Sequence, residues 1–250
     1  MWALYSIINK IMKIFNLIYS DSKINGNLII ASFSFIFSLI IPLFFGIKFF
    51  IVMCIQVILL VHEMGHYYAM KYFKFKDIKI IFYPFMAFTT TTSTLNSRFS
   101  KIVVSFAGPL PGILIGSLLL LFEYYLSDNW IFFSKALVYI NTFNLIPVAL
   151  LDGGNIFECL FISDSNKRIG IFHLITGTGS AIVCIANSHY AFIWLCLLIV
   201  IRGILFFKHR KDPPILKFND ILNLKDKILF SVLWSGTIII AIISRFWEIY

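Results

Sequence analysis

The chain alternates long apolar runs with short polar breaks, and this pattern predicts helices that cross a membrane. A helix needs about 20 apolar residues to cross the roughly 30 Å of hydrocarbon in a bilayer. The runs Asn27 to Gly46 and Lys101 to Leu126 reach that length. Seven spans are predicted in all, at residues 27–46, 48–70, 101–126, 130–151, 170–188, 190–207 and 228–246. The expected fold class is an all-α polytopic membrane protein with about six to seven transmembrane helices.

One segment between the second and third spans departs from the helical pattern. Lys79 to Leu95, KIIFYPFMAFTTTTSTL, is rich in β-branched and aromatic residues and contains Pro84. This composition favours strands over helix. Both neighbouring spans end on the same side of the membrane, so the segment must enter and return. We expect a re-entrant β-hairpin or loop, whose backbone polar groups are covered by protein or face a wet cavity.

Three further segments are not expected to be spans of their own. Residues 1–19 are interrupted by Lys10 and Lys13, which predicts an amphipathic helix at the membrane interface. In NLIPVALLDGG, Asn144 to Gly154, the proline removes a helical hydrogen bond and the paired glycines predict a break. Residues 208–227 form the longest clearly polar stretch and are expected to be a cytoplasmic loop.

Composition and charge support a membrane location. Hydrophobic residues make up 60% of the chain and charged residues only 13%, whereas a soluble domain has about 25% charged residues. If the N-terminus is cytoplasmic, all of the 21 lysines and arginines lie in cytoplasmic segments except Lys48, Lys135, Arg202 and Arg245. This asymmetry predicts a cytoplasmic N-terminus. It also accounts for the net charge of +9, so nucleic-acid binding is not expected.

The second span ends in a group that suits a metal ion. His62 and His66, in HEMGH, are four residues apart and therefore share one face of a helix. Two imidazoles can hold one zinc ion at about 2.0–2.1 Å, together with a third protein ligand and a water. Glu63, next to the first histidine, is the candidate general base that takes a proton from this water. A buried carboxylate between two histidines is costly in lipid, and a divalent cation offsets that cost.

The third ligand should lie at a similar depth in the membrane. At 1.5 Å per residue, the two histidines lie roughly 7–13 Å from the cytoplasmic edge near Lys71. Asp152 ends the fourth span at this same inner side, which makes it the preferred ligand. Glu123 lies near the outer end of its span, Glu158 is closer to the cytoplasm, and His173 belongs to no recognisable motif.

These segments together resemble a known family. HEMGH, the stretch SFAGPLPG from Ser105 to Gly112, and NLIPVALLDGG occur in this order within residues 50–160. The combination resembles the site-2 protease family of zinc intramembrane metalloproteases, whose N-x-x-P-x-x-x-L-D-G element supplies an aspartate to the zinc. The resemblance implies that His62, His66 and Asp152 bind one zinc ion. The expected organisation is a single transmembrane metalloprotease domain over 1–250 with a catalytic core at 50–160, as in a minimal member of the family without a PDZ or CBS domain.

The family resemblance implies an activity and a substrate class. The expected function is zinc-dependent hydrolysis of peptide bonds within or near transmembrane segments of membrane-protein substrates. Such a segment must unwind before cleavage, and Thr89, Thr90 and Thr91 of the hairpin are candidates to pair with it. Asn144 either helps to hold the reaction intermediate or satisfies backbone groups freed by Pro147. The expected location is the inner membrane of a bacterium, with the site near the cytoplasmic leaflet.

Two alternatives remain open from the sequence. The first is a gluzincin-type membrane peptidase that uses Glu158 as the third zinc ligand. The second is a catalytically idle relative that binds membrane segments. The sequence does not indicate the substrate, the regulatory trigger or the oligomeric state.

Overall fold

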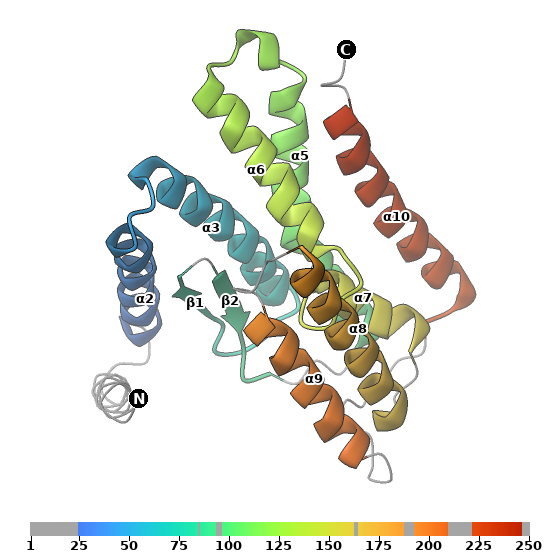
Figure 1. The fold of residues 1–250 in the computed structure, drawn as a ribbon. Coiled ribbons are helices and arrows are strands. Elements are labelled where there is room, and N and C mark those ends of the chain that lie inside the picture. Colours follow the sequence, from blue (N-terminus) through green and yellow to red (C-terminus); the bar gives the residue numbers. More distant parts are fainter. Residues whose placement is uncertain are drawn as a thin grey trace.

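The computed structural model describes residues 25–84, 86–93, 97–162, 165–187, 193–209 and 222–246. This part of the chain is mostly helical and contains one small β-hairpin (Figure 1). In chain order the elements are α2 (Asn25–Phe44), α3 (Phe49–Tyr72), β1 (Lys79–Tyr83), β2 (Met86–Thr90), α4 (Arg98–Ala107), α5 (Pro109–Leu120), a short 3-10 helix (Glu123–Tyr125), α6 (Asp128–Asn144), α7 (Asp152–Phe161), α8 (Asn166–Ala186), α9 (Ile193–Lys208) and α10 (Leu224–Phe246). The predicted interfacial helix at 1–19 and most of the predicted loop at 208–227 lie outside the described residues.

Each of the seven predicted spans contains helix, but the helices differ in length and apolar character. Within the described residues, three are long and apolar enough to cross a membrane: Phe49–Tyr72, the combined Arg98–Leu120, and Asn166–Ala186. Ile30–Phe44 is a shorter apolar helix. Large apolar side chains such as Phe44 and Leu121 are more than three-quarters exposed, as expected for surfaces that face lipid. The chain is therefore a helical membrane protein.

The predicted hairpin is confirmed. β1 and β2 pair in antiparallel register from Lys79 opposite Thr90 to Tyr83 opposite Met86. The hairpin lies beside α2 and the second half of α3 (Figure 1). The Phe82 amide donates to the Ser34 hydroxyl of α2 at 3.1 Å. These contacts fix the hairpin next to the end of α3 that carries HEMGH.

Two predicted spans are broken where proline or glycine occurs. The predicted 101–126 span is divided into α4 and α5 at Gly108, and Pro109 occupies the first turn of α5, where the missing N–H costs nothing. In the predicted 130–151 span, the helix is α6, which ends at Asn144. A loop containing Pro147 follows, and α7 then begins at Asp152. The fourth predicted span is thus a helix followed by a loop. The paired glycines, which were expected to break the helix, lie instead in the first turn of α7.

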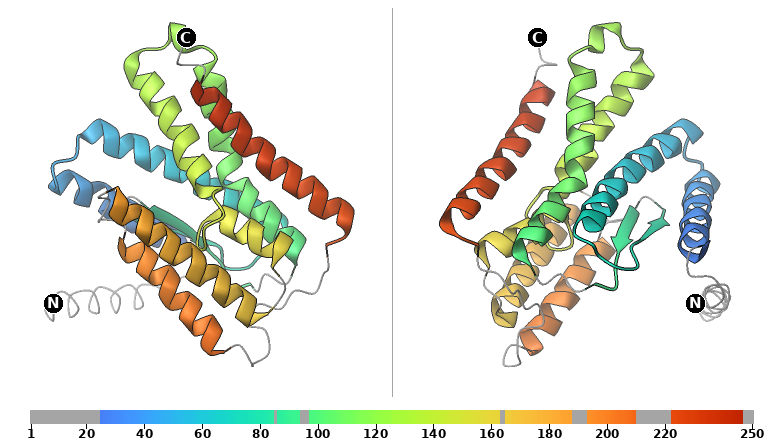
Figure 2. Two further views of the ribbon diagram at one scale, coloured as in Figure 1. Left: turned by 45° about the vertical axis from the view of Figure 1, so that its right-hand side comes forward. Right: turned by 180° about the vertical axis from the view of Figure 1, so that it is seen from behind.

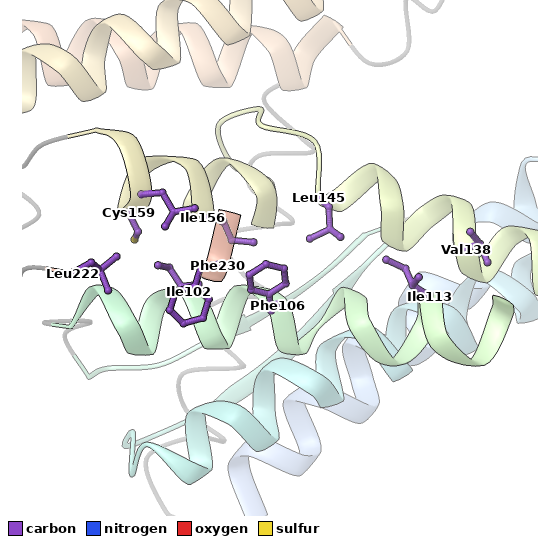
Figure 3. Packing of buried hydrophobic residues seen from close by; sticks show 10 residues of the cluster. Ile102, Phe106, Ile113, Val138, Leu145, Ile156, Cys159, Leu222 and Phe230 are labelled. Atoms are coloured by element: carbon purple, nitrogen blue, oxygen red, sulfur yellow. The ribbon is translucent and has the colours of Figure 1, made fainter. Parts of the chain in front are cut away.

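The main buried core lies between α4 and α7. Ile102 and Phe106 of α4 face Ile156 and Cys159 of α7, with Leu145 of the preceding loop beside them (Figure 3). α5 packs closely against α6, and α8 against α9, as the further views show (Figure 2). The core therefore joins the segment that follows the hairpin to the helix that begins with Asp152.

Candidate metal centre

α3 carries His62, Glu63 and His66 into the protein interior. Their exposed fractions are only 4%, 3% and 8%. They form a buried group whose ligand atoms lie within 4.8 Å of one another. Gly65 lets α4 approach this turn closely, because a Cβ there would collide with the Ala107 carbonyl. A glycine is therefore required between the two histidines for α3 and α4 to pack as they do.

Asp152 meets both histidines at one point. Its Oδ2 atom lies 3.2 Å from Nε2 of His62 and 3.3 Å from Nε2 of His66. The two Nε2 atoms are 3.0 Å apart. Three ligand atoms from two separate helices, α3 and α7, thus form a nearly equilateral triangle.

Hydrogen bonds to the other ring nitrogens orient both imidazoles. Nδ1 of His62 is 2.8 Å from Oδ1 of Asn141, and Nδ1 of His66 is 2.8 Å from the Val104 carbonyl. The Asn141 amide nitrogen donates to the Leu137 carbonyl at 2.8 Å, so its oxygen is the atom that faces His62. Both Nδ1 atoms therefore donate, and both Nε2 lone pairs point toward Asp152.

This donor set fits a zinc ion. A tetrahedral zinc with bonds of about 2.0–2.1 Å places its ligand atoms about 3.3–3.4 Å apart, close to the three distances measured. Two imidazole lone pairs and a carboxylate oxygen facing one another repel unless a cation lies between them. Histidines whose Nδ1 atoms donate to oxygen acceptors are the usual arrangement of zinc ligands.

Glu63 is held by the hairpin. The Thr89 hydroxyl lies 2.6 Å from the Glu63 carboxylate and 3.2 Å from the Glu63 backbone carbonyl. Thr89 thus joins strand β2 to the turn of α3 that bears both histidines. The carboxylate is held beside the histidines without forming part of the triangle.

The loop before α7 presents Asp152 to the centre. Leu150 adopts a left-handed backbone, with φ of 78°, which turns the chain into α7. A Cβ at Gly153 would collide with the Leu145 carbonyl and lie 2.5 Å from the Ile146 carbonyl oxygen. The indole of Trp234 on α10 donates to the Leu145 carbonyl at 2.9 Å. The N-terminus of α7 is therefore held against its own loop.

Two glycines of the 108–112–116 series make room for the site. A Cβ at Gly108 would lie 2.5 Å from Cε1 of His66 and closer still to its Nε2. A Cβ at Gly112 would lie 2.5 Å from Cγ of Asn141. Only Gly116 serves helix packing alone, against the Ser134 carbonyl and Val138. In addition to the close helix packing typical of such spacing, Gly108 and Gly112 therefore leave room for the side chains of His66 and Asn141.

The remaining sequence candidates lie in other surroundings. Both Glu158 oxygens are engaged, one by Lys101 at 3.0 Å and the other by His173 at 2.8 Å. The Asn144 amide donates to the Ile140 carbonyl of its own helix at 3.0 Å. Glu123 lies in the 3-10 helix after α5.

The threonines of the hairpin face different ways. Thr90 is exposed, and the Thr91 hydroxyl bonds the Lys76 carbonyl at 2.6 Å. Of these three threonines, only Thr89 bonds the Glu63 carboxylate. Asn141 was missed by the sequence reasoning. An asparagine one turn before Asn144, in a largely apolar run, was the available signal, and its burial is seen only in the structure.

Comparison with known proteins gives two matches. Residues 49–135 match the family model described as Peptidase family M50. A solved structure, the site-2 protease from Methanocaldococcus jannaschii, is similar at 17% identity and a TM-score of 0.48, covering 76% of this chain and 93% of that chain. No curated protein matches. The matched segment contains the buried HEMGH group. Residues 49–135 of the chain are therefore similar to peptidase family M50.

Proposed function

We propose that this protein is a zinc-dependent intramembrane endopeptidase, which cleaves membrane-protein substrates within or near their transmembrane segments. The observation that carries the proposal is the triangle of His62 Nε2, His66 Nε2 and Asp152 Oδ2, with sides of 3.0, 3.2 and 3.3 Å. Its two histidines lie on α3, a helix long and apolar enough to span a membrane.

The roles of the residues follow from their places in the site. His62, His66 and Asp152 would hold the ion, and when bound, zinc supplies Lewis-acid activation of a water molecule and of a carbonyl group. Glu63 takes the proton from the attacking water and returns it to the leaving amine. Thr89 keeps the Glu63 carboxylate in one orientation through their 2.6 Å hydrogen bond. Asn144 has a structural role in this proposal, since its amide bonds its own helix.

The Glu158 alternative is not favoured by the geometry. Both oxygens of this carboxylate already bond Lys101 and His173. Asp152 instead contacts both zinc-binding histidines. The buried HEMGH group likewise favours an active peptidase over an idle relative.

The hairpin is the proposed binding element for the substrate. A helical substrate hides its peptide groups, so the cleaved segment must unwind and pair as a strand. Pairing along β2 would bring that segment beside Glu63, because Thr89 of this strand contacts the Glu63 carboxylate. In this arrangement the exposed Thr90 would contact the substrate, whereas the Thr91 hydroxyl already bonds the Lys76 carbonyl. Replacing Thr90 with proline should slow cleavage, and an unchanged rate would remove the hairpin from substrate binding.

The proposed topology extends over the whole chain. In this topology all seven predicted spans cross the membrane, the N-terminus is cytoplasmic, and residues 1–250 form one metalloprotease domain with its core at 50–160. Lys71 at the end of α3 marks the cytoplasmic edge, which puts the site roughly 10 Å below the inner surface. The inner membrane of a bacterium is the proposed location, and the bilayer itself is a partner of the exposed apolar faces.

Metal analysis coupled to a cleavage assay tests the proposal. Purified protein should contain one zinc per chain and should cleave a transmembrane reporter substrate. Glu63→Gln should keep the zinc and lose turnover, while Asp152→Ala should lose both. Retention of stoichiometric zinc by Asp152→Ala would contradict the ligand set. Equal turnover in Glu63→Gln and the parent would contradict the catalytic role of Glu63.

A further inference from the structure

A second group of charged side chains is buried outside the metal centre. Glu158 of α7 lies between Lys101 of α4, at 3.0 Å, and His173 of α8, at 2.8 Å. The exposed fractions are 6% for Glu158, 8% for Lys101 and 0% for His173. One carboxylate therefore ties three helices together away from water.

Stability does not explain such a group. Removing two charges from water costs several kcal/mol per ion, and hydrophobic residues of similar size are often neutral or better at the same place. Apolar packing between α4 and α7 is already provided by the core around Ile102 and Ile156 (Figure 3). The ion pair adds directional contacts between specific atoms, which apolar packing does not provide.

The two helices joined by this pair each hold one part of the metal centre. On α4, the Val104 carbonyl accepts from His66 at 2.8 Å, and Val104 is one turn, about 4.5 Å along the axis, from Lys101. On α7, Asp152 is the first residue, about 9 Å along the axis from Glu158. The helices run in opposite directions, because Arg98 at the start of α4 bonds the Cys159 and Ile162 carbonyls at the end of α7.

We infer that Lys101 and Glu158 are positioning residues for the metal centre, with their ion pair setting the register of α4 against α7. A slip of α7 along α4 would move Asp152 away from His66 by the same amount. His173 holds the second Glu158 oxygen, so the carboxylate has one orientation rather than two. The inference rests on the proposed zinc site, and it assigns a function to charged residues that do not touch the ion.

The inference is tested by substitutions that remove the charge of Lys101 alone, or the charges of Lys101 and Glu158 together. Lys101→Met leaves Glu158 without its cation, whereas Lys101→Met combined with Glu158→Met removes both charges and keeps apolar volume. The measurements are zinc affinity by competition with a chelator, the visible spectrum of the cobalt(II)-substituted protein, kcat and KM separately, and the melting temperature. If Lys101→Met does not fold, the double variant still provides the test.

The double variant should melt close to the parent temperature and yet bind zinc roughly 10-fold more weakly. Its cobalt spectrum should shift, and kcat should fall more than KM rises. Lys101→Arg, which keeps the cation, should restore zinc affinity. The matched control is Gln56→Leu, which breaks the buried pair between Gln56 and Ser38 at 3.1 Å on α3 and α2. It should lower the melting temperature and leave the cobalt spectrum unchanged.

The outcomes distinguish the two proposals. If the parent binds zinc and the double variant has the same zinc affinity and cobalt spectrum, the positioning role is wrong while the metal site stands. If zinc affinity simply follows melting temperature across all variants, including Gln56→Leu, the pair is only structural. A parent protein that binds no zinc overturns both proposals.

Discussion

Gly108→Ala should disable the metal centre by adding a single methyl group. Gly108 lies between α4 and α5 with φ of −68° and ψ of −63°, a backbone that alanine adopts without strain. The substitution therefore tests the space at this position, not chain flexibility. The added Cβ would point at the imidazole of His66, which is a proposed zinc ligand.

The required displacement can be read from the structure. The new Cβ would lie 2.5 Å from Cε1 and 2.9 Å from Cδ2 of His66, whereas ordinary contacts begin near 3.4 Å. The ring must move by roughly 1 Å, but its Nδ1 is held by the Val104 carbonyl at 2.8 Å. Zinc–ligand distances tolerate only about 0.2 Å of change. We expect zinc affinity to fall at least about 100-fold, with peptidase activity falling in parallel.

The assay compares Gly108→Ala with Gly116→Ala of the same helical series. A Cβ at Gly116 would lie 2.8 Å from the Ser134 carbonyl oxygen and from Cγ2 of Val138. It disturbs the packing of α5 on α6, which should cost about 1–3 kcal/mol of unfolding free energy, and should leave zinc affinity unchanged. Chelator competition gives the affinity, and thermal unfolding in detergent gives the stability.

Two results would refute this reasoning. If Gly108→Ala binds zinc as tightly as the parent, His66 is not held where the structure places it. If Gly116→Ala loses zinc to the same extent, the glycines act through helix packing and not through space around the ligand.

Three further predictions concern residues around the same centre. Asn141→Leu removes the acceptor from Nδ1 of His62 and should weaken zinc binding about 10- to 100-fold, measured by chelator competition; an unchanged affinity would contradict the orienting role. Thr89→Val removes the hydrogen bond to the Glu63 carboxylate and should lower kcat roughly 10-fold with zinc content unchanged, and an unaltered kcat would show that the base needs no such support. Gly153→Ala forces the start of α7 away from the Leu145 and Ile146 carbonyls and should abolish zinc binding. The control is Gly179→Ala, whose Cβ would meet nothing within 4 Å. It should change neither the zinc content nor the melting temperature.

Local patterns in the sequence were sufficient for several features. The apolar runs predicted the helices, because the cost of exposing backbone polar groups in lipid leaves few other structures. The β-branched and aromatic residues from Lys79 onward predicted the hairpin, which the structure contains as β1 and β2. The spacing of His62 and His66 predicted their shared helix face. Each of these predictions depends on residues close together in the chain.

The boundaries and the partners of the site needed the tertiary structure. The residues at which the third predicted span divides, Gly108, and at which the helix of the fourth span ends, Asn144, came from the structure. The contact of Asn141 with His62 joins residues 79 positions apart, and no local pattern indicates it. Likewise, the bond between Thr89 and Glu63 joins residues 26 positions apart, while the expected contact of Thr89 with substrate stays a prediction.

The sequence by itself therefore determined a helical membrane protein with a hairpin and an HEMGH helix, because periodicity and residue type act over one or two turns. Only the tertiary structure brought Asp152 within 3.3 Å of His66 and buried Lys101 against Glu158. It also placed Gly108 and Gly112 against His66 and Asn141, where there is no room for a Cβ. Those features depend on the relative placement of α3, α4 and α7. Many packing contacts between distant segments set that placement, so it cannot be predicted from the sequence of any one helix.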